Sequence, residues 1–129
     1  MALHLRLGRA GEDEAERRLA RKGFRILARN YRVKNGEVDL ICRAGKTIVF
    51  VEVKTRGPGS LAAPLDAVNA KKRARLIRAA SAYLSENDLW DAPCRFDVAA
   101  LISTNAGMTF EHIENAFGLE GMGGMYQPF

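Results

Sequence analysis

The segment from Gly36 to Thr55, GEVDLICRAGKTIVFVEVKT, constrains the fold of this chain more than any other. Apolar and polar residues alternate on both sides of a short turn, a period that is typical of β-strands. The residues Ala44 to Thr47 fit a two-residue turn of type II′, because Gly45 occupies the first central position, where that turn requires glycine. The segment is therefore predicted to be a β-hairpin.

The turn also predicts the register of the hairpin. With Ala44 opposite Thr47, three pairs have their side chains on the other face of the hairpin. They are Ile41 with Phe50, Asp39 with Glu52, and Glu37 with Lys54. A three-residue loop would shift the register by one and place Asp39 opposite Val51, on the other face. The first register is favoured because it leaves one face entirely apolar, formed by Val38, Leu40, Cys42, Val49, Val51 and Val53.

Two carboxylates meet on this hairpin if the first register holds. Directly paired residues have Cβ atoms roughly 4.5–5.5 Å apart, and like charges at that distance repel one another. A nearby cation relieves the repulsion between Asp39 and Glu52, and hard divalent cations prefer carboxylate oxygens. Lys54 lies two residues beyond Glu52 on the same face. The pattern thus predicts two acids and a lysine that converge on a metal site.

Size and charge bound the remaining possibilities. A chain of 129 residues is predicted to form one domain, here residues 1–117, with 118–129 as a loosely ordered glycine-rich tail. The net charge of +5 and pI near 9.6 favour an anionic partner such as nucleic acid. We expect a cytoplasmic protein without a membrane partner, because long apolar runs and a signal-peptide segment are missing from the sequence. Cys42 and Cys94 are expected to be buried, reduced thiols rather than zinc ligands.

The first helix is predicted over Gly8–Lys22, after a lead-in at residues 3–7, and Gly23 is expected to end it. Its narrow apolar stripe consists of Ala15, Leu19 and Ala20, and Glu12 points along that stripe. One interpretation is that Glu12 favours the helix dipole or pairs with a local arginine. The other is that it supplies a third acid to the hairpin site.

The other elements follow in an alternating order. Strands are predicted over residues 24–32, 94–102 and 108–116, the last with a short helical turn at its end, and a second helix over 65–87. Residues 56–64, rich in Gly, Pro and Ser, are predicted to form a mobile loop. The order α-β-β-β-α-β-β predicts an α/β fold, a mixed sheet flanked by helices.

Two basic segments suit contact with nucleic acid. Arg29, Arg32 and Lys34 surround Tyr31, a mix that suits phosphate contact and base stacking, or else guards a sheet edge against aggregation. The second helix carries a basic run that either tracks phosphates or is simply a solvated face. His112 is expected to be structural or at the surface rather than a catalyst. The basic run consists of Lys71, Lys72, Arg73, Arg75 and Arg78.

The motifs together resemble a known family. Asp39, followed by Glu52-Val53-Lys54, is similar to the signature of the PD-(D/E)xK nuclease superfamily, with Val38 in place of the proline. The full set of segments resembles the YraN-like bacterial family, which is related to archaeal Holliday junction resolvases. That likeness covers residues 8–117 and is carried by GRAGEDEAERRLARKGFRILARNYR, GEVDLI, VFVEVKTR, AVNAKKRARL and RFDV.

This resemblance implies a restriction-endonuclease-like fold and a Mg²⁺- or Mn²⁺-dependent nuclease that acts on DNA, including branched or structured DNA. It implies that Glu12, Asp39, Glu52 and the Val53 carbonyl bind metal, which activates a water for attack on a phosphodiester, and that Lys54 assists that attack. Two alternatives stay open: a nuclease fold used only to bind nucleic acid, and a protein-interaction domain. A homodimer also stays open, because cutting two strands of a junction benefits from two-fold symmetry.

Overall fold

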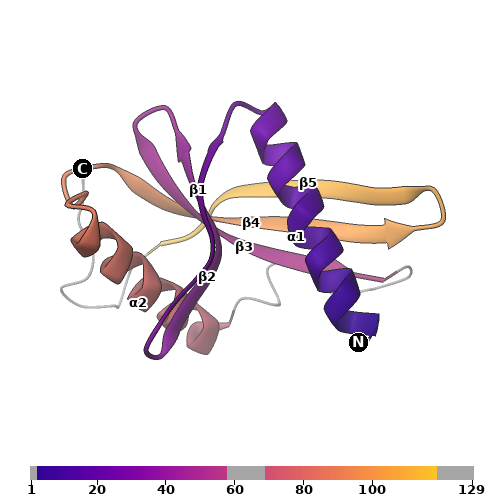
Figure 1. Cartoon of the computed structure of the whole chain (residues 1–129), viewed down its shortest axis with the longest axis horizontal. Coiled ribbons are helices and arrows are strands. Elements are labelled where there is room, and N and C mark those ends of the chain that lie inside the picture. The colour runs from indigo at the N-terminus through magenta and orange to yellow at the C-terminus, as the bar shows by residue number, and fades with distance from the viewer. Residues whose placement is uncertain (1–2, 58–68, 119–129) are drawn as a thin grey trace.

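A computed structural model describes residues 3–57 and 69–118 of the chain (Figure 1). The order of elements is α-β-β-β-α-β-β, as the sequence predicts. Neither helix of the described part offers an apolar stretch long enough to cross a membrane. The elements are α1 (Leu3–Arg21), β1 (Arg25–Val33), β2 (Gly36–Ala44), β3 (Thr47–Arg56), α2 (Ala70–Glu86), β4 (Cys94–Thr104) and β5 (Gly107–Phe117).

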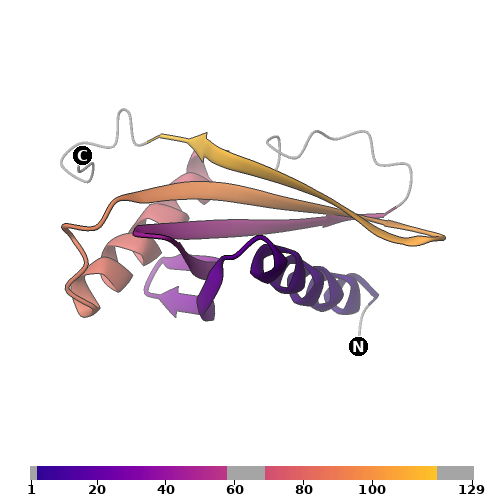
Figure 2. The same cartoon turned by 90° about the horizontal axis from the view of Figure 1, so that it is seen from above.

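The five strands form one mixed sheet in the order β1-β2-β3-β4-β5. Each neighbouring pair is antiparallel except β3 and β4, which run parallel. Parallel neighbours need a long crossover, and α2 lies in that connection. Figure 2 shows β3, β4 and β5 extending side by side as long strands, while the β1–β2 hairpin lies below them.

Each face of the sheet is covered by one helix and holds its own apolar cluster. On one face, α1 contributes Ala15 and Leu19, which are fully buried against residues of β2, β3 and β4 such as Val51. On the other, α2 contributes Leu76 and Ile77 to a cluster around the buried Phe50. Successive residues of β3 point to opposite faces of the sheet, and each face is covered by a helix. The residues of this central strand are therefore apolar on both faces.

The hairpin turns form as predicted. Gly45 has φ of 62°, the positive value that a type II′ turn requires at this position. The predicted register is confirmed from the Ala44–Thr47 pair to the Leu40–Val51 pair. Asn35, in the turn between β1 and β2, also has a positive φ, 62°, a conformation that asparagine tolerates better than most residues.

The register prediction is wrong beyond Leu40. In the described part of the chain the β2–β3 ladder ends there, so Asp39–Glu52 and Glu37–Lys54 are not ladder pairs. The Asp39 carboxylate instead accepts a hydrogen bond from the backbone N–H of Val53, at 2.8 Å. Because β2 turns away from β3 at this point, Val38 packs in the α2 cluster and not with the other five residues of the predicted apolar face.

Several element boundaries also differ from the prediction. Helix α1 begins at Leu3, so residues 3–7 are helical rather than a lead-in, and Ala20 is exposed. Asn69 is the N-cap of α2, with its side chain accepting from the Lys72 N–H, so the helix starts at Ala70. Strand β5 continues to Phe117 without a helical turn. The predicted loop beyond residue 57, residues 65–68 and the tail beyond residue 118 lie outside the described residues.

The two cysteines are free, as predicted. Cys42 is buried in the α1 cluster, whereas Cys94, at the start of β4, is only half-buried. The prediction that both thiols are buried is therefore wrong for Cys94. This residue begins β4, where β3 lies on one side but the ladder with β5 does not reach.

Candidate functional site

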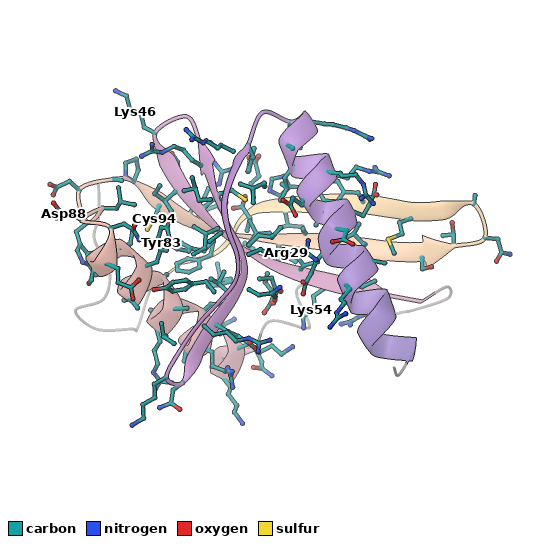
Figure 3. The ribbon with its side chains drawn as sticks, in the orientation of Figure 1. Arg29, Lys46, Lys54, Tyr83, Asp88 and Cys94 are labelled. Atoms are coloured by element: carbon teal, nitrogen blue, oxygen red, sulfur yellow. The ribbon has the colours of Figure 1, made fainter. Side chains whose placement is uncertain are left out.

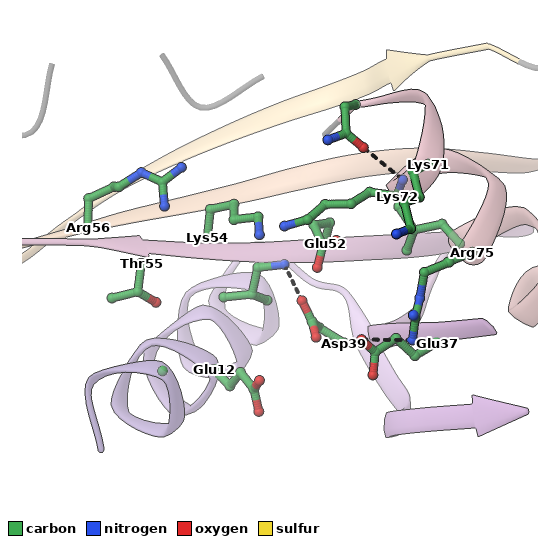
Figure 4. Close-up of a pocket in the computed structure, with 14 residues that line it drawn as sticks. Glu12, Glu37, Asp39, Glu52, Lys54, Thr55, Arg56, Lys71, Lys72 and Arg75 are labelled. Atoms are coloured by element: carbon green, nitrogen blue, oxygen red, sulfur yellow. Dashed lines mark hydrogen bonds and ion pairs between the residues drawn. The ribbon is translucent and has the colours of Figure 1, made fainter. Parts of the chain in front are cut away.

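A cavity of about 550 Å³ opens between the beginning of β2, the C-terminal half of β3, helix α1 and the first turn of α2 (Figure 4). Most of the acids and bases that the sequence singles out converge there. The cavity is lined by Gly8, Glu12, Glu37, Asp39, Glu52, Val53, Lys54, Thr55, Arg56, Asn69, Lys71, Lys72, Arg75 and Leu76.

Asp39 and Glu52 lie side by side in this cavity. Their carboxyl groups are within hydrogen-bonding reach of one another although the two residues are not paired in the ladder. Burial, reinforced by the neighbouring Glu52, raises the pKa of Asp39. The hydrogen bond from Val53 N–H, which favours the charged form, only partly opposes that shift. The two acids are therefore close together as predicted, but they are not cross-strand partners, because β2 separates from β3 before it reaches them.

Glu12 reaches the same cavity from α1, with one fifth of its side chain exposed. It accepts a hydrogen bond from Asn30 Nδ2 at 3.3 Å and pairs with Arg29 at 3.5 Å. Burial and then the charge of Asp39 raise the pKa of Glu12. Glu12 thus pairs with an arginine, although one on β1 rather than a local one, and it also lies near the acid pair.

Lys54 extends into the cavity from β3, beside Glu52 (Figure 3 and Figure 4). Burial lowers the pKa of Lys54, and the proximity of Lys72 lowers it further. Figure 4 shows the two lysine side chains pointing toward one another from β3 and from the first turn of α2. The acid pair and this pair of lysines are thus neighbours along the same wall.

Glu37 is an acid of the cavity that the sequence analysis did not propose. Its carboxylate pairs with Arg32 of β1 at 3.2 Å and with Arg75 of α2 at 3.5 Å. It therefore connects the hairpin to the helix rather than pairing with Lys54. The strand pattern could have indicated Glu37, because it lies two residues before Asp39 and therefore points to the same face of β2.

The other lining residues that were missed left weaker signals. Thr55 and Arg56 continue β3 past Lys54, and Arg56 has the parity of Glu52 and Lys54, which the strand pattern could have indicated. Asn69 is a residue type favoured at N-caps, but the apolar residues before it favoured a longer helix.

Some of the predicted nucleic-acid contacts lie away from this cavity. Lys34 is exposed on the β1–β2 turn, and Arg73 lies over the ring of Phe117 at 5.9 Å. Tyr31 does not offer a stacking surface, because it is half-buried and packs edge-on against Tyr83 with the ring centroids 5.4 Å apart. Of the predicted set, Lys71, Lys72 and Arg75 line the cavity directly.

The chemistry of the cavity suits a divalent cation, although its geometry is not that of a closed metal site. Over residues 3–57 and 69–118, no three His, Cys, Asp or Glu side chains are grouped as they would be around a bound ion. Asp39 and Glu52 nevertheless offer two adjacent carboxylates whose negative charges repel, and a cation relieves that repulsion. Those two residues would hold the ion, with Glu12 and the Val53 carbonyl as further candidates.

A second polar cluster lies outside this cavity, around Asp97 of β4. His112 Nε2 contacts its buried carboxylate at 2.7 Å, and Asn115 N–H donates to it at 2.9 Å. Lys22 Nζ lies 2.6 Å from His112 Nδ1; since an ammonium only donates, Nε2 carries the proton that goes to Asp97. Burial opposes ionisation of Asp97, but these bonds and those from Arg95 lower its pKa. His112 is therefore a structural partner of a buried acid.

Fold and site together define an α/β protein whose central hairpin and two helices enclose a cavity with paired acids and paired lysines. Over residues 11–101 the chain matches the family described as "Uncharacterised protein family UPF0102". The chain belongs to that family, which is the YraN-like family that its motifs indicate.

Relatives that share this family name cover almost the whole chain. A "UPF0102 protein" of Nitratidesulfovibrio vulgaris is 52% identical over 126 residues, 95% of this chain and 94% of the relative. "UPF0102 protein Cphamn1_0017" of Chlorobium phaeobacteroides is 47% identical over 117 residues, covering 86% and 93%. A "UPF0102 protein" of Ectopseudomonas mendocina is 42% identical over 118 residues, covering 91% and 98%.

Proposed function

We propose that the protein is a Mg²⁺- or Mn²⁺-dependent nuclease of the PD-(D/E)xK type that hydrolyses phosphodiesters in DNA. One observation carries this proposal. Asp39 and Glu52 share a cavity with their carboxyl groups within hydrogen-bonding reach of one another, and Lys54 lies beside them. Structural needs alone do not account for such a pair, because unpaired acids near a core are costly.

Each side chain has a role that follows from its charge and position. Asp39 and Glu52 would hold the cation, and the Val53 N–H fixes the orientation of the Asp39 carboxylate. When bound, a divalent ion neutralises phosphate charge and lowers the pKa of a bound water. The Lys54 ammonium stabilises negative charge that develops on the phosphate oxygens. Lys71 and Arg75, on the rim formed by α2, attract the nucleic-acid backbone.

The test is cleavage of a panel of linear, flapped and four-way DNA with Mg²⁺ or Mn²⁺, compared with EDTA. The wild-type protein is expected to cut at least one of these substrates, because branched or structured DNA is the class that the motifs indicate. Asp39→Asn, Glu52→Gln and Lys54→Met should each reduce cleavage by 100-fold or more, about the loss that follows removal of one electrostatic group from an active site.

Lys46→Met is the matched control for the lysine substitution. Lys46 is exposed at the tip of the β2–β3 turn, well away from Lys54 (Figure 3), so its loss should leave cleavage unchanged. If the wild-type protein cuts no substrate faster than Asp39→Asn does, the proposed activity is wrong.

One observation favours a second candidate, a nuclease fold that binds nucleic acid without cutting it. Asn30 and Arg29 already engage Oε1 of Glu12, which makes this residue a weaker candidate for a third metal ligand. Binding without catalysis predicts that affinity for DNA survives Asp39→Asn and Glu52→Gln. It also predicts that a calcium titration, followed by calorimetry, detects no carboxylate site.

A further inference from the structure

Two lysines face one another across the cavity wall. Lys54 projects from β3 and Lys72 from the first turn of α2, within hydrogen-bonding reach of each other (Figure 4). Two ammonium groups repel, as two carboxylates do. Neither ammonium forms an ion pair with any carboxylate of the described residues, and the two lysines belong to different elements of the fold, so their approach is not a feature of one flexible segment.

The first turn of α2 makes this placement costly. The N-terminal end of a helix carries partial positive charge, so a cation there is destabilising, whereas an acid would be stabilising. The first turn of α2 nevertheless contains no acid, and Lys71 and Lys72 occupy it behind the Asn69 cap. Local stability therefore does not explain why cations gather at this end of the helix.

The acids of the cavity offset this cluster only in part, through Glu52 and Asp39 beside Lys54. Among the lining residues that the structure describes, basic side chains outnumber acidic ones, five to four. Arg75 is already paired with Glu37, and Glu12 with Arg29, so both of those acids are engaged by arginines. The five bases are Lys54, Arg56, Lys71, Lys72 and Arg75, and the four acids are Glu12, Glu37, Asp39 and Glu52.

We propose that Lys54 and Lys72 together form an anion site that binds one phosphate group carrying two negative charges. Two facing ammonium groups match a phosphate monoester or inorganic phosphate, whereas a phosphodiester carries only one charge for the two of them. Lys72 would thus be a binding residue for a terminal phosphate, such as the new end of a cut strand. This last step rests on the proposed function; binding of inorganic phosphate does not.

The experiment measures phosphate binding to the full chain in EDTA, without divalent ions. Inorganic phosphate is titrated while the lysine Nζ resonances are followed by NMR, and its dissociation constant is compared between variants. Lys72→Met should weaken binding at least tenfold and remove the shift of the Lys54 resonance. Lys46→Met should leave both unchanged, because Lys46 lies at a distant turn.

A third variant separates a defined site from diffuse positive charge. Lys71 carries the same charge in the same helical turn and also lines the cavity, but it is exposed. Lys71→Met is expected to weaken phosphate binding less than threefold. Equal losses in Lys71→Met and Lys72→Met, or phosphate binding that Lys72→Met leaves intact, would overturn the paired-lysine site, as would a wild-type protein that binds no phosphate.

Two oligonucleotides of one sequence then identify the source of the phosphate. A strand with a 5′-phosphate should bind more tightly than the same strand with a 5′-hydroxyl, and Lys72→Met should abolish the difference. If the two strands bind equally, the preference for a terminal phosphate is wrong. Asp39→Asn should retain phosphate binding even if it abolishes cleavage, so the anion site and the nuclease activity can fail separately.

Discussion

Asp39 makes the stability of the metal-free protein dependent on pH. Burial and Glu52 raise the pKa of Asp39 from 3.8 to about 8, so the folded state holds this proton more tightly than the unfolded state does. Stability is therefore expected to fall as pH rises between these values. Urea denaturation in EDTA at pH 5, 6.5 and 8 should show that decline in the wild-type protein.

Asp39→Asn should flatten the decline, because an amide does not titrate, and the variant should be more stable than the wild-type protein at pH 8. Adding Mn²⁺ at pH 8 should raise the stability of the wild-type protein but not that of Asp39→Asn. Asp91→Asn, a change in an exposed acid, should follow the wild-type curve. A wild-type stability that is constant from pH 5 to 8 would contradict this expectation.

Asp97 is expected to have the opposite dependence on pH. Hydrogen bonds from His112, Asn115 and Arg95 overcome its burial and lower its pKa below 3.8. Its contribution to stability is therefore present at neutral pH and is lost as pH falls through the lowered value. Asp97→Asn should reduce the free energy of unfolding by about 3 kcal/mol at pH 7, because it leaves buried donors without their charged partner.

The measurement is again urea denaturation, at pH 7 and at pH 3. The difference in free energy of unfolding between Asp97→Asn and the wild-type protein should be smaller at pH 3. Asp91→Asn serves as the control here too. A gap that widens on acidification would show that the Asp97 network stabilises the protein by some means other than charge.

At the scale of the elements, β2 lies in close contact with α2 at Gly36. A Cβ atom at this position would lie 2.9 Å from both the backbone N of Ala79 and the backbone O of Arg75. Since these are helix backbone atoms, the strand itself must move. Gly36→Ala is expected to cost about 1–3 kcal/mol of stability. It should also weaken metal binding, because Glu37 and Asp39 follow directly on the displaced strand.

Gly57→Ala is the matched control, because a Cβ there meets nothing within 4 Å. Its free energy of unfolding, measured by urea denaturation, should stay within about 0.5 kcal/mol of the wild-type value. If Gly36→Ala is equally well tolerated, the close approach of β2 to α2 does not constrain the site.

The hairpin shows how far local patterns predict an element. Gly45 fixed the turn, and the turn fixed the register for the pairs nearest to it. Past Leu40 the prediction was wrong, because the departure of β2 from β3 depends on its packing under α2 and on the Asp39 bond to Val53, both of which are tertiary contacts. The proximity of Asp39 and Glu52 was predicted correctly, but the predicted cross-strand pairing of these two residues was wrong.

The helix boundaries show a second limit. Leu3 to Leu7 alternate with polar residues, a pattern that does not distinguish a strand or a lead-in from a helix over so short a stretch. Gly11, in contrast, is buried where α1 meets β3, and a Cβ there would overlap the Thr55 side chain. That close contact could not be predicted from one sequence, because nothing local requires glycine within a helix.

For the molecule as a whole, charge would determine how the proposed binding to DNA responds to salt. Each phosphate neutralised by a lysine or arginine changes the slope of log K against log salt concentration by about −0.9 on duplex DNA. Lys71→Met should therefore reduce the magnitude of that slope by about 0.9, measured by fluorescence anisotropy at several salt concentrations. Lys46→Met should leave the slope unchanged, because the β2–β3 turn lies away from the cavity.

If both variants change the slope equally, the net charge of +5 acts diffusely and the cavity is not the binding face. The basic rim was predicted from the α2 run alone, and only part of it proved to line the cavity. Which cations of a helix face a given strand depends on the angle at which the helix packs, and a single sequence does not specify that angle.

The cavity residues that the structure describes all lie between Gly8 and Leu76. Strand β3, which carries Glu52 and Lys54, is nevertheless held between β2 and a strand that begins only at Cys94. During synthesis, every group of the site therefore leaves the ribosome before the strand that completes its support. A fragment that stops ahead of Cys94 would contain these site residues, but β3 would then be an apolar edge strand without a partner. Such an edge promotes aggregation. The proposed nuclease activity should thus appear only in chains that extend through β4, however complete the site is upstream.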